Sequence, residues 1–280
     1  MSVPKLFSDT WFLLQQEGLL AQACLCNGLS ALRKANLGDR KGLFYSSFFE
    51  LSIGFERTLK LILILDHMAR NKLVPPDSKA IESYGHKLIP LFDAAKAVST
   101  ARSLNSLQAF TADSLPIRIL AFLDNFAHPG GRYANINKLT GHRHQTMADP
   151  IAQWGEIASR IVREYATNRQ RQQTKLNGQV VSAALGDAAM SLISDLDQQH
   201  PDIACLFTRF SELEIAAKHA IFALVTLIAA LSEVLGSVCE SAWVANPPTS
   251  SGMTDVPNMK EFFQFAWPDK SYVMRKTRWP

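Results

Sequence analysis

Three side chains have the chemistry that acid–base catalysis on a phosphate ester would need: Glu56, His86 and Arg132. Histidine takes up and releases a proton readily, because the ordinary pKa of an imidazole lies near neutrality. The planar fork of arginine matches two oxygens of a phosphate group. A glutamate in an apolar helix is either an active acid or the structural partner of a cation such as Lys60 or Arg132. The sequence favours the structural role for Glu56, yet all three remain candidate catalytic residues.

The surroundings of these residues leave more than one role open. His86 lies on a predicted helix with apolar neighbours, from which it either reaches Glu56 or Arg132 across a bundle or hydrogen-bonds a buried polar group. Arg132 follows two glycines, where a backbone can approach a ligand closely. The alternative is an ordered loop that fills one end of the bundle. Tyr133 and Asn135 follow at once and are candidates for stacking on, and hydrogen-bonding to, a nucleic-acid base.

A second basic stretch lies further along the chain. Arg160 and Arg163 share one face of a predicted helix, as do Arg171 and Lys175. The three arginines are therefore candidate nucleic-acid-binding residues. The alternative is an ordinary solvated helix face, because acidic residues are interspersed with the basic ones.

Motifs for metals and cofactors are missing from the sequence. His142 and His144 offer two ligands at most, which favours a solvated turn, and Cys24 and Cys26 point to different faces of a helix. There is no G-x-x-x-x-G-K-[ST], G-x-G-x-x-G, H-E-x-x-H or G-x-S-x-G. We therefore predict no cofactor and no metal, and we expect all four cysteines to be core thiols in a reducing cytosol.

Composition excludes several classes of protein. The 280 residues are 47% hydrophobic and 19% charged, with a net charge of +4. Such a chain is not disordered as its main state, and its charge permits nucleic-acid binding without arguing for it. Residues 1–9 lack the apolar run of a signal peptide. The uncharged stretch 219–232 is shorter than the roughly 20 residues of a membrane span. We expect a cytoplasmic protein with no membrane partner.

Helical periodicity runs through most of the chain, and no strand-like alternation recurs. Segment 128–131 stops one helix, 132–137 is predicted to be irregular, and Asn177-Gly178 is a predicted break. The apolar stretch 215–235 is either the core of the C-terminal half or a dimer interface. The sequence predicts an all-α, up-and-down bundle of about seven helices, with the first, second and last central. These predicted helices cover about 8–35, 41–70, 77–98, 114–126, 150–173, 180–198 and 200–243.

Three short motifs occur in order in the N-terminal half. Residues 52–63 read SIGFERTLKLIL, residues 84–88 read YGHKL after a proline-containing loop, and residues 131–135 read GRYAN. This pattern resembles the HEPN-like helical domains of bacterial defence and toxin–antitoxin proteins, over about residues 40–140. The resemblance implies an all-α bundle that is often dimeric and often a metal-independent ribonuclease.

The nuclease motif of that family is Arg, four to six residues, then His. Here Arg57 and His67, like Arg118 and His128, are separated by nine residues, so no pair fits. The resemblance therefore supports the fold more than the activity.

Two functions remain open. One is a HEPN-like protein that acts on RNA, as a metal-independent endoribonuclease of a toxin–antitoxin or phage-defence system. The other is a non-catalytic helical module that binds a partner protein, a nucleotide or RNA. The expected partners are RNA or a cognate protein, together with a second copy of the chain. We expect a HEPN-like core at 8–145, additional helices at 146–245 and an aromatic and basic tail at 246–280.

Overall fold

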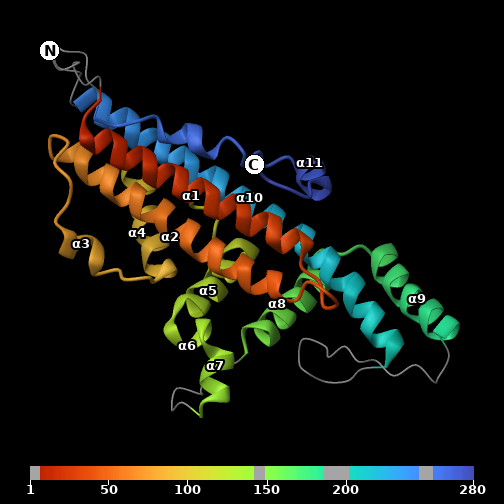
Figure 1. The fold of residues 1–280 in the computed structure, drawn as a ribbon. Coiled ribbons are helices and arrows are strands. Elements are labelled where there is room, and N and C mark those ends of the chain that lie inside the picture. The colour runs from red at the N-terminus through yellow and green to blue at the C-terminus, as the bar shows by residue number, and fades with distance from the viewer. Residues whose placement is uncertain (1–6, 142–148, 186–201, 246–254) are drawn as a thin grey trace, which may run out of the picture.

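The computed structural model describes residues 7–141, 149–185, 202–245 and 255–280, and in these ranges the protein is helical without a β-strand (Figure 1). The predicted all-α class and bundle character are confirmed. The helices are more numerous than the seven expected, because two predicted helices are broken and one segment predicted to be irregular is helical. The helices are α1 (Asp9–Lys34), α2 (Gly42–Arg70), α3 (Ser78–Glu82), α4 (Leu88–Ala101), α5 (Leu115–Ala127), α6 (Pro129–Arg132), α7 (Ala134–Leu139), α8 (Pro150–Tyr165), α9 (Asn168–Leu185), α10 (Ile203–Ala245), the 3-10 helix η1 (Met259–Phe263) and α11 (Lys270–Arg275).

Helices α1 and α2 lie side by side and pack closely through two glycines (Figure 1). A Cβ on Gly28 would lie 2.6 Å from Cγ of Leu51, and a Cβ on Gly54 would lie 2.7 Å from Cγ of Leu25. The hydroxyl of Ser47 donates a 2.9 Å hydrogen bond to the carbonyl of Gly28 across the same contact. Glycine lowers the stability of an isolated helix. Here its lack of a side chain allows the two backbones to approach.

The longest helix, α10, runs through the centre of the bundle and contacts α1, α2, α5, α8 and α9. Its inner residues, from Ala216 to Ala242, have almost no exposed surface. Among the described residues it is the one helix whose length and composition would allow a membrane span. However, 67% of its most apolar window is buried inside the bundle, as in the core helix of a soluble protein. Of the two roles predicted for 215–235, the structure shows the core.

The prediction of one helix over 77–98 is wrong, because the chain leaves the helical conformation in the middle of this segment. Helix α3 ends at Glu82, and Gly85 has a φ of +54° before α4 begins at Leu88. A left-handed residue cannot continue a right-handed helix. His86 therefore lies in a short connection rather than inside a helix. The start of α4 is held by α5, since Asp124 Oδ1 accepts a 2.7 Å hydrogen bond from the backbone N–H of Leu88.

The prediction of one basic helix over 150–173 is also wrong, because this segment is divided between two helices, α8 and α9. Thr167 starts the second with a capping box. Its backbone N–H donates to Gln170 Oε1 (2.8 Å), and its hydroxyl accepts from the backbone N–H of Gln170 (3.2 Å). The break predicted at Asn177-Gly178 is absent, since Gly178 lies inside α9, close to the carbonyl of Ala204 on α10. Of the helix predicted over 180–198, residues 186–198 lie outside the described ranges.

Two further expectations concern loops and thiols. Helix α5 ends before His128 as predicted, yet the segment predicted to be irregular after it forms α6 and α7. Of the cysteines predicted to be core thiols, Cys26 and Cys239 are buried and Cys24 is half-buried, whereas Cys205 is exposed. His142 and His144 lie outside the described residues.

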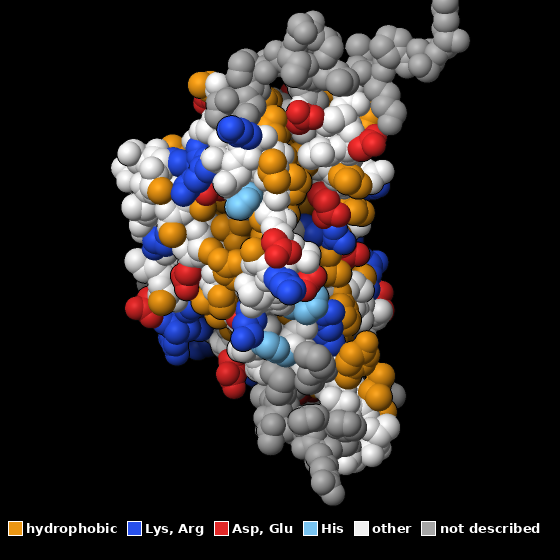
Figure 2. All heavy atoms as spheres, turned by 90° about the vertical axis from the view of Figure 1, so that its left-hand side faces the viewer, with side chains coloured by type: hydrophobic (Ala, Val, Ile, Leu, Met, Phe, Trp, Pro, Cys, Tyr) orange, Lys and Arg blue, Asp and Glu red, His pale blue; other side chains and the backbone are white. Residues whose placement is uncertain are grey.

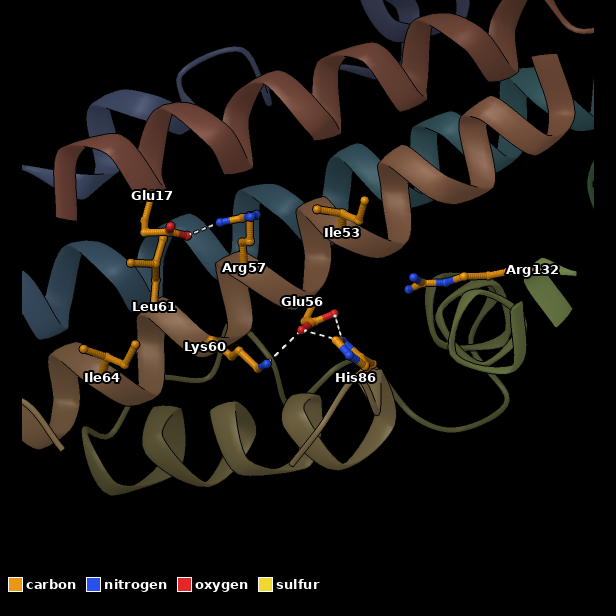
Figure 3. A pocket seen from close by; sticks show the side chains of 9 residues that line it. All are labelled: Glu17, Ile53, Glu56, Arg57, Lys60, Leu61, Ile64, His86 and Arg132. Carbon is orange, nitrogen blue, oxygen red and sulfur yellow. Dashed lines mark hydrogen bonds and ion pairs between the residues drawn. The ribbon is translucent and has the colours of Figure 1, made fainter. Parts of the chain in front are cut away.

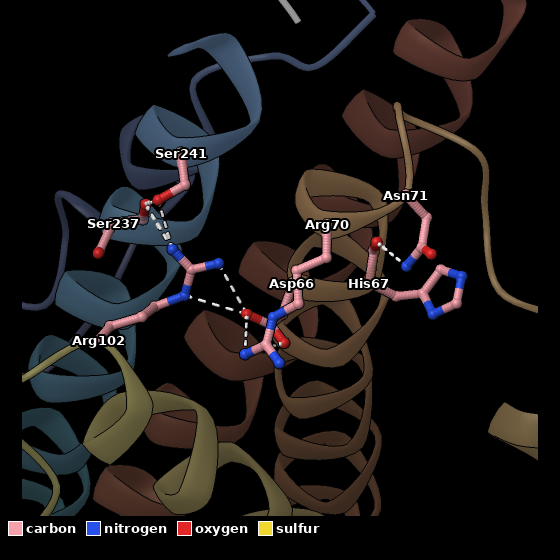
Figure 4. Close-up of polar contacts among 7 residues, drawn as sticks. All are labelled: Asp66, His67, Arg70, Asn71, Arg102, Ser237 and Ser241. Carbon is pink, nitrogen blue, oxygen red and sulfur yellow. Dashed lines mark hydrogen bonds and ion pairs between the residues drawn. The ribbon is translucent and has the colours of Figure 1, made fainter. Parts of the chain in front are cut away.

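A buried ion-pair network joins α2, the end of α4 and α10 (Figure 4). Arg102 donates from Nε (3.0 Å) and Nη2 (2.7 Å) to Asp66 Oδ1. Its Nη1 donates to the hydroxyl of Ser241 and to the carbonyl of Ser237. Arg70 adds a second cation, 2.9 Å from Asp66 Oδ2. Every nitrogen of the Arg102 guanidinium therefore has a partner, and the side chains of Asp66 and Arg102 are only 10% and 13% exposed.

Candidate functional site

The described residues enclose a cavity of about 400 Å³ where α1, α2, the α3–α4 connection and α6 meet (Figure 3). We call it the Glu56–His86 pocket. It brings together all three candidate catalytic residues, although 30 residues separate Glu56 from His86 along the chain. The lining residues are Glu17, Ile53, Glu56, Arg57, Lys60, Leu61, Ile64, His86 and Arg132.

Glu56 lies at the centre of the polar contacts in this pocket. Its side chain is 14% exposed. Oε1 accepts a 2.8 Å hydrogen bond from Nζ of Lys60, one helical turn away, as the i, i+4 spacing predicts. Nδ1 of His86 lies 3.0 Å from Oε2 and 3.1 Å from Oε1. The carboxylate of Glu56 therefore binds two partners, Lys60 and His86, and the pairing with Lys60 is the structural one that the sequence predicts.

The contact with Glu56 fixes which nitrogen of the His86 ring faces solvent. With Nδ1 directed at the carboxylate, the tautomer that donates its Nδ1–H leaves Nε2 with a free lone pair. The side chain of His86 is 69% exposed, so a substrate has direct access to the ring. An imidazole held by a carboxylate in this way has the arrangement of a general base whose orientation is set by a neighbour.

Arg132 reaches into the pocket from α6, and its guanidinium points toward the side of α2 that carries Glu56 (Figure 3). Its Cζ lies 5.9 Å from the ring centroid of Phe49, at the distance of a cation–π contact. Its Nε is buried and has no hydrogen-bond partner within the described part of the chain. A buried donor without a partner costs free energy unless a ligand or solvent satisfies it. Because Arg132 lines the pocket with its guanidinium directed toward α2, the guanidinium is the group that could hold an acceptor such as a phosphate oxygen (Figure 3).

Sequence reasoning missed part of the pocket wall. Arg57 is ion-paired with Glu17 of α1, and Ile53, Leu61 and Ile64 supply apolar surface beside the charges. The spacing of Ile53, Lys60 and Ile64 relative to Glu56 places them along one face of α2, which is a signal that could have found them. No local pattern connects Glu17 with a residue 40 positions away.

The two residues predicted to bind a base do not line this pocket. Tyr133 is 54% exposed between α6 and α7, which leaves its ring free to stack. Asn135 has a structural partner, because its Nδ2 donates a 2.9 Å hydrogen bond to the hydroxyl of Tyr45. The exposed ring of Tyr133 can therefore stack on a base next to Arg132, whereas one hydrogen-bond donor of Asn135 is already bound to Tyr45.

The predicted basic stretch is divided between α8 and α9, and its arginines have partners within the protein. Nε of Arg160 donates to Glu164 (2.6 Å), which also receives Nη2 of Arg118 (2.6 Å). Nη1 of Arg171 donates to the backbone carbonyl of Arg163 (2.8 Å), across the break between the helices. These contacts occupy the guanidinium groups of Arg160 and Arg171. Arg163, Arg169 and Lys175 are exposed, and within the described residues their side chains have no hydrogen bond or ion pair.

Charge does not gather into one basic surface on the face turned to the viewer in Figure 2, where basic, acidic, histidine and apolar side chains are intermixed. Attraction of a polyanion to this face thus depends on local groups rather than on a broad positive field. Among the described residues, no group of three His, Cys, Asp or Glu side chains is arranged to hold a metal ion. Comparison with family models, curated proteins and solved structures finds no match to the chain.

Proposed function

We propose that this protein acts on RNA at the Glu56–His86 pocket, as a HEPN-like, metal-independent endoribonuclease of a bacterial toxin–antitoxin or phage-defence system. The observation that supports the proposal is the hydrogen bond from His86 to Glu56 in the same cavity that the guanidinium of Arg132 lines. These groups supply an oriented base and a phosphate-binding cation, which RNA cleavage without a metal requires.

The proposed reaction uses the 2′-hydroxyl of the substrate as the nucleophile. Nε2 of His86 takes the 2′ proton while the 2′-oxygen bonds to phosphorus and the bond to the 5′-oxygen breaks. Glu56 stabilises the resulting imidazolium through Nδ1–H. Arg132 and Lys60 offset the negative charge that develops on the phosphate oxygens. The leaving 5′-oxygen takes its proton from the ammonium of Lys60 or from water.

One observation favours the alternative of a non-catalytic binding module. Among the residues that the structure describes, His86 is the single histidine that lines the pocket, so they offer no second imidazole to act as the acid. In that case Arg132 and Lys60 bind the phosphate of RNA or of a nucleotide without cleaving it. The charges and the apolar side chains of the pocket suit such a ligand equally well.

The deciding experiment is a cleavage assay on a labelled single-stranded RNA in the presence of EDTA. Wild type is compared with His86→Ala, Arg132→Ala and His67→Ala, a matched control on α2 outside the pocket. The endonuclease proposal expects cleavage by wild type and His67→Ala and a loss of about a hundredfold or more in the other two. Absence of cleavage by wild type, with RNA binding that weakens in Arg132→Ala, supports the binding module. Absence of both cleavage and binding contradicts an RNA function for this pocket.

A second copy of the chain is the proposed protein partner, in the cytoplasm. Every residue of α1 between Phe12 and Asn27 that is classed as exposed is uncharged, while Glu17, whose side chain is 44% exposed, is ion-paired with Arg57 beside this face. An uncharged face of this kind suits a symmetric contact between two identical helices. Light scattering coupled to size exclusion should show a dimer that Leu13→Glu with Leu20→Glu converts to monomer. The exposed residues of the face are Phe12, Leu13, Gln16, Leu19, Leu20, Ala23 and Asn27.

A further inference from the structure

A second cavity, of about 310 Å³, lies between the start of α5, the end of α8 and the middle of α10. We call it the α5–α10 pocket. It shares no lining residue with the Glu56–His86 pocket. Its walls are mainly apolar, with side chains that include Phe110, Leu115 and Phe222. The volume is at the small end of the range of about 300–1,000 Å³ that is usual for ligand pockets, so the site suits a small molecule.

The charged group that lines this cavity is a cation, and no acidic residue among the described ones lines it as well. Lys270, the first residue of α11, is exposed and has no ion-pair partner in the ranges that the structure describes. The neighbouring carboxylate of Asp269 is used within its own turn, where Oδ1 accepts hydrogen bonds from the backbone N–H of Tyr272 and the hydroxyl of Ser271. Lys270 is therefore available to an anion at this cavity.

His219 adds a second polar group from α10. Its ring packs beside that of Tyr165, with centroids 5.7 Å apart. Burial, together with the positive charges of Lys270 and Lys218, lowers the pKa of His219, so its ring is neutral at neutral pH. A neutral imidazole still has one N–H to donate. The ring thus offers a hydrogen bond without adding a buried charge.

We propose that the α5–α10 pocket binds a small organic acid, with its one-ring aromatic or short aliphatic body against Phe110, Leu115 and Phe222 and its carboxylate between Lys270 and His219. The apolar walls select the body of the ligand, because burial of apolar surface stabilises it there. The unpaired ammonium and the imidazole N–H select the carboxylate. A cationic ligand would meet the charge of Lys270 with no acid to offset it.

The test is isothermal titration calorimetry of the full chain with 3-phenylpropanoate and with its neutral counterpart, 3-phenylpropanamide. The two probes share the apolar body and differ in the charge of the head group. Wild type is compared with Lys270→Met, and with Lys79→Met as a matched control at an exposed lysine on α3. Lys270 is exposed, so circular dichroism should show the same helicity in all three proteins.

The proposal expects the acid to bind wild type and Lys79→Met more tightly than the amide, with an affinity about fivefold weaker in Lys270→Met. Binding of the amide should not change in Lys270→Met. A second variant, Ala223→Met, places a flexible side chain in the cavity and should weaken both probes. Equal affinity for the acid and the amide, unchanged binding of the acid by Lys270→Met, or no binding of the acid to wild type would each overturn the proposal.

Discussion

Two charge clusters on helix α2 look alike in the sequence and differ in the fold. Glu56 has Lys60 four residues later, and Asp66 has Arg70 four residues later. Each carboxylate also receives a second partner from a distant segment, which is His86 for Glu56 and Arg102 for Asp66. The two clusters therefore have the same arrangement. In each, the carboxylate binds one basic residue four positions later on α2 and one residue from another segment of the chain.

The difference lies in whether the donors are satisfied. Around Asp66, all three guanidinium nitrogens of Arg102 bind protein acceptors, and the pair is almost completely buried. Around Glu56, a cavity of about 400 Å³ remains, the His86 ring is mostly exposed, and Nε of Arg132 has no acceptor in the described residues. A closed network stabilises the fold, whereas an open one leaves hydrogen-bonding capacity for a ligand.

The largest expected effect tests the closed cluster. Arg102→Met should lower the free energy of unfolding by about 3 kcal/mol, because the buried carboxylate of Asp66 loses its main partner. Urea denaturation followed by circular dichroism measures this change. The control Arg40→Met removes an exposed pair with Asp39 and should cost less than about 0.5 kcal/mol. A loss of under about 1 kcal/mol for Arg102→Met would mean that the network is not what holds α2, α4 and α10 together.

In the cluster around Glu56, removal of the arginine should affect ligand binding more than the free energy of unfolding. Arg132→Met should change the free energy of unfolding by less than about 1 kcal/mol, because Nε gives up no protein hydrogen bond and only the contact with Phe49 is altered. If the pocket binds RNA, affinity should fall about tenfold, which corresponds to roughly 1.4 kcal/mol. Fluorescence anisotropy with a labelled RNA measures the affinity. Destabilisation as large as that of Arg102→Met would place Arg132 among the structural residues instead.

The smallest effect comes from a cluster whose carboxylate is fully paired but exposed. Glu164 accepts hydrogen bonds from Arg118 and Arg160, which lower its pKa from the ordinary 4.5 to about 2. Because the pKa is lower in the folded state, this carboxylate stabilises the fold above about pH 4.5, and the contribution is lost as the pH falls toward 2. Solvent screening at a 32% exposed side chain should keep it below about 1 kcal/mol at neutral pH.

The variant Glu164→Gln checks this pH dependence. Urea denaturation at neutral pH, and at values between 4.5 and 2, should show that the difference between wild type and the variant shrinks as the medium becomes more acidic. A difference that stays constant with pH would show that Glu164 contributes through packing rather than through its charge. A loss comparable to that of Arg102→Met would break the distinction between buried and exposed ion-pair networks.

Local signals predicted several helix ends correctly. Ser8 caps α1 by accepting the backbone N–H of Trp11, and α5 begins after Ser114 and ends before His128. These boundaries depend on residues within one or two turns of each end, which the sequence displays directly. The connection at Gly85 and the capping box at Thr167 are also local, yet the sequence predicts a continuous helix at both places, with no more than a loosened turn at 84–86.

By itself the sequence determined that the chain is all-helical and which side chains have acid–base or phosphate-binding chemistry, and it left Lys60 and Arg132 as alternative partners of Glu56. Only the tertiary structure decided which of these groups meet. His86 reaches Glu56 across 30 residues, and Arg102 reaches Ser241 across 139. The difference between an open pocket and a closed network depends on how the helices pack, and helical periodicity records which face of a helix is buried but not what lies against it.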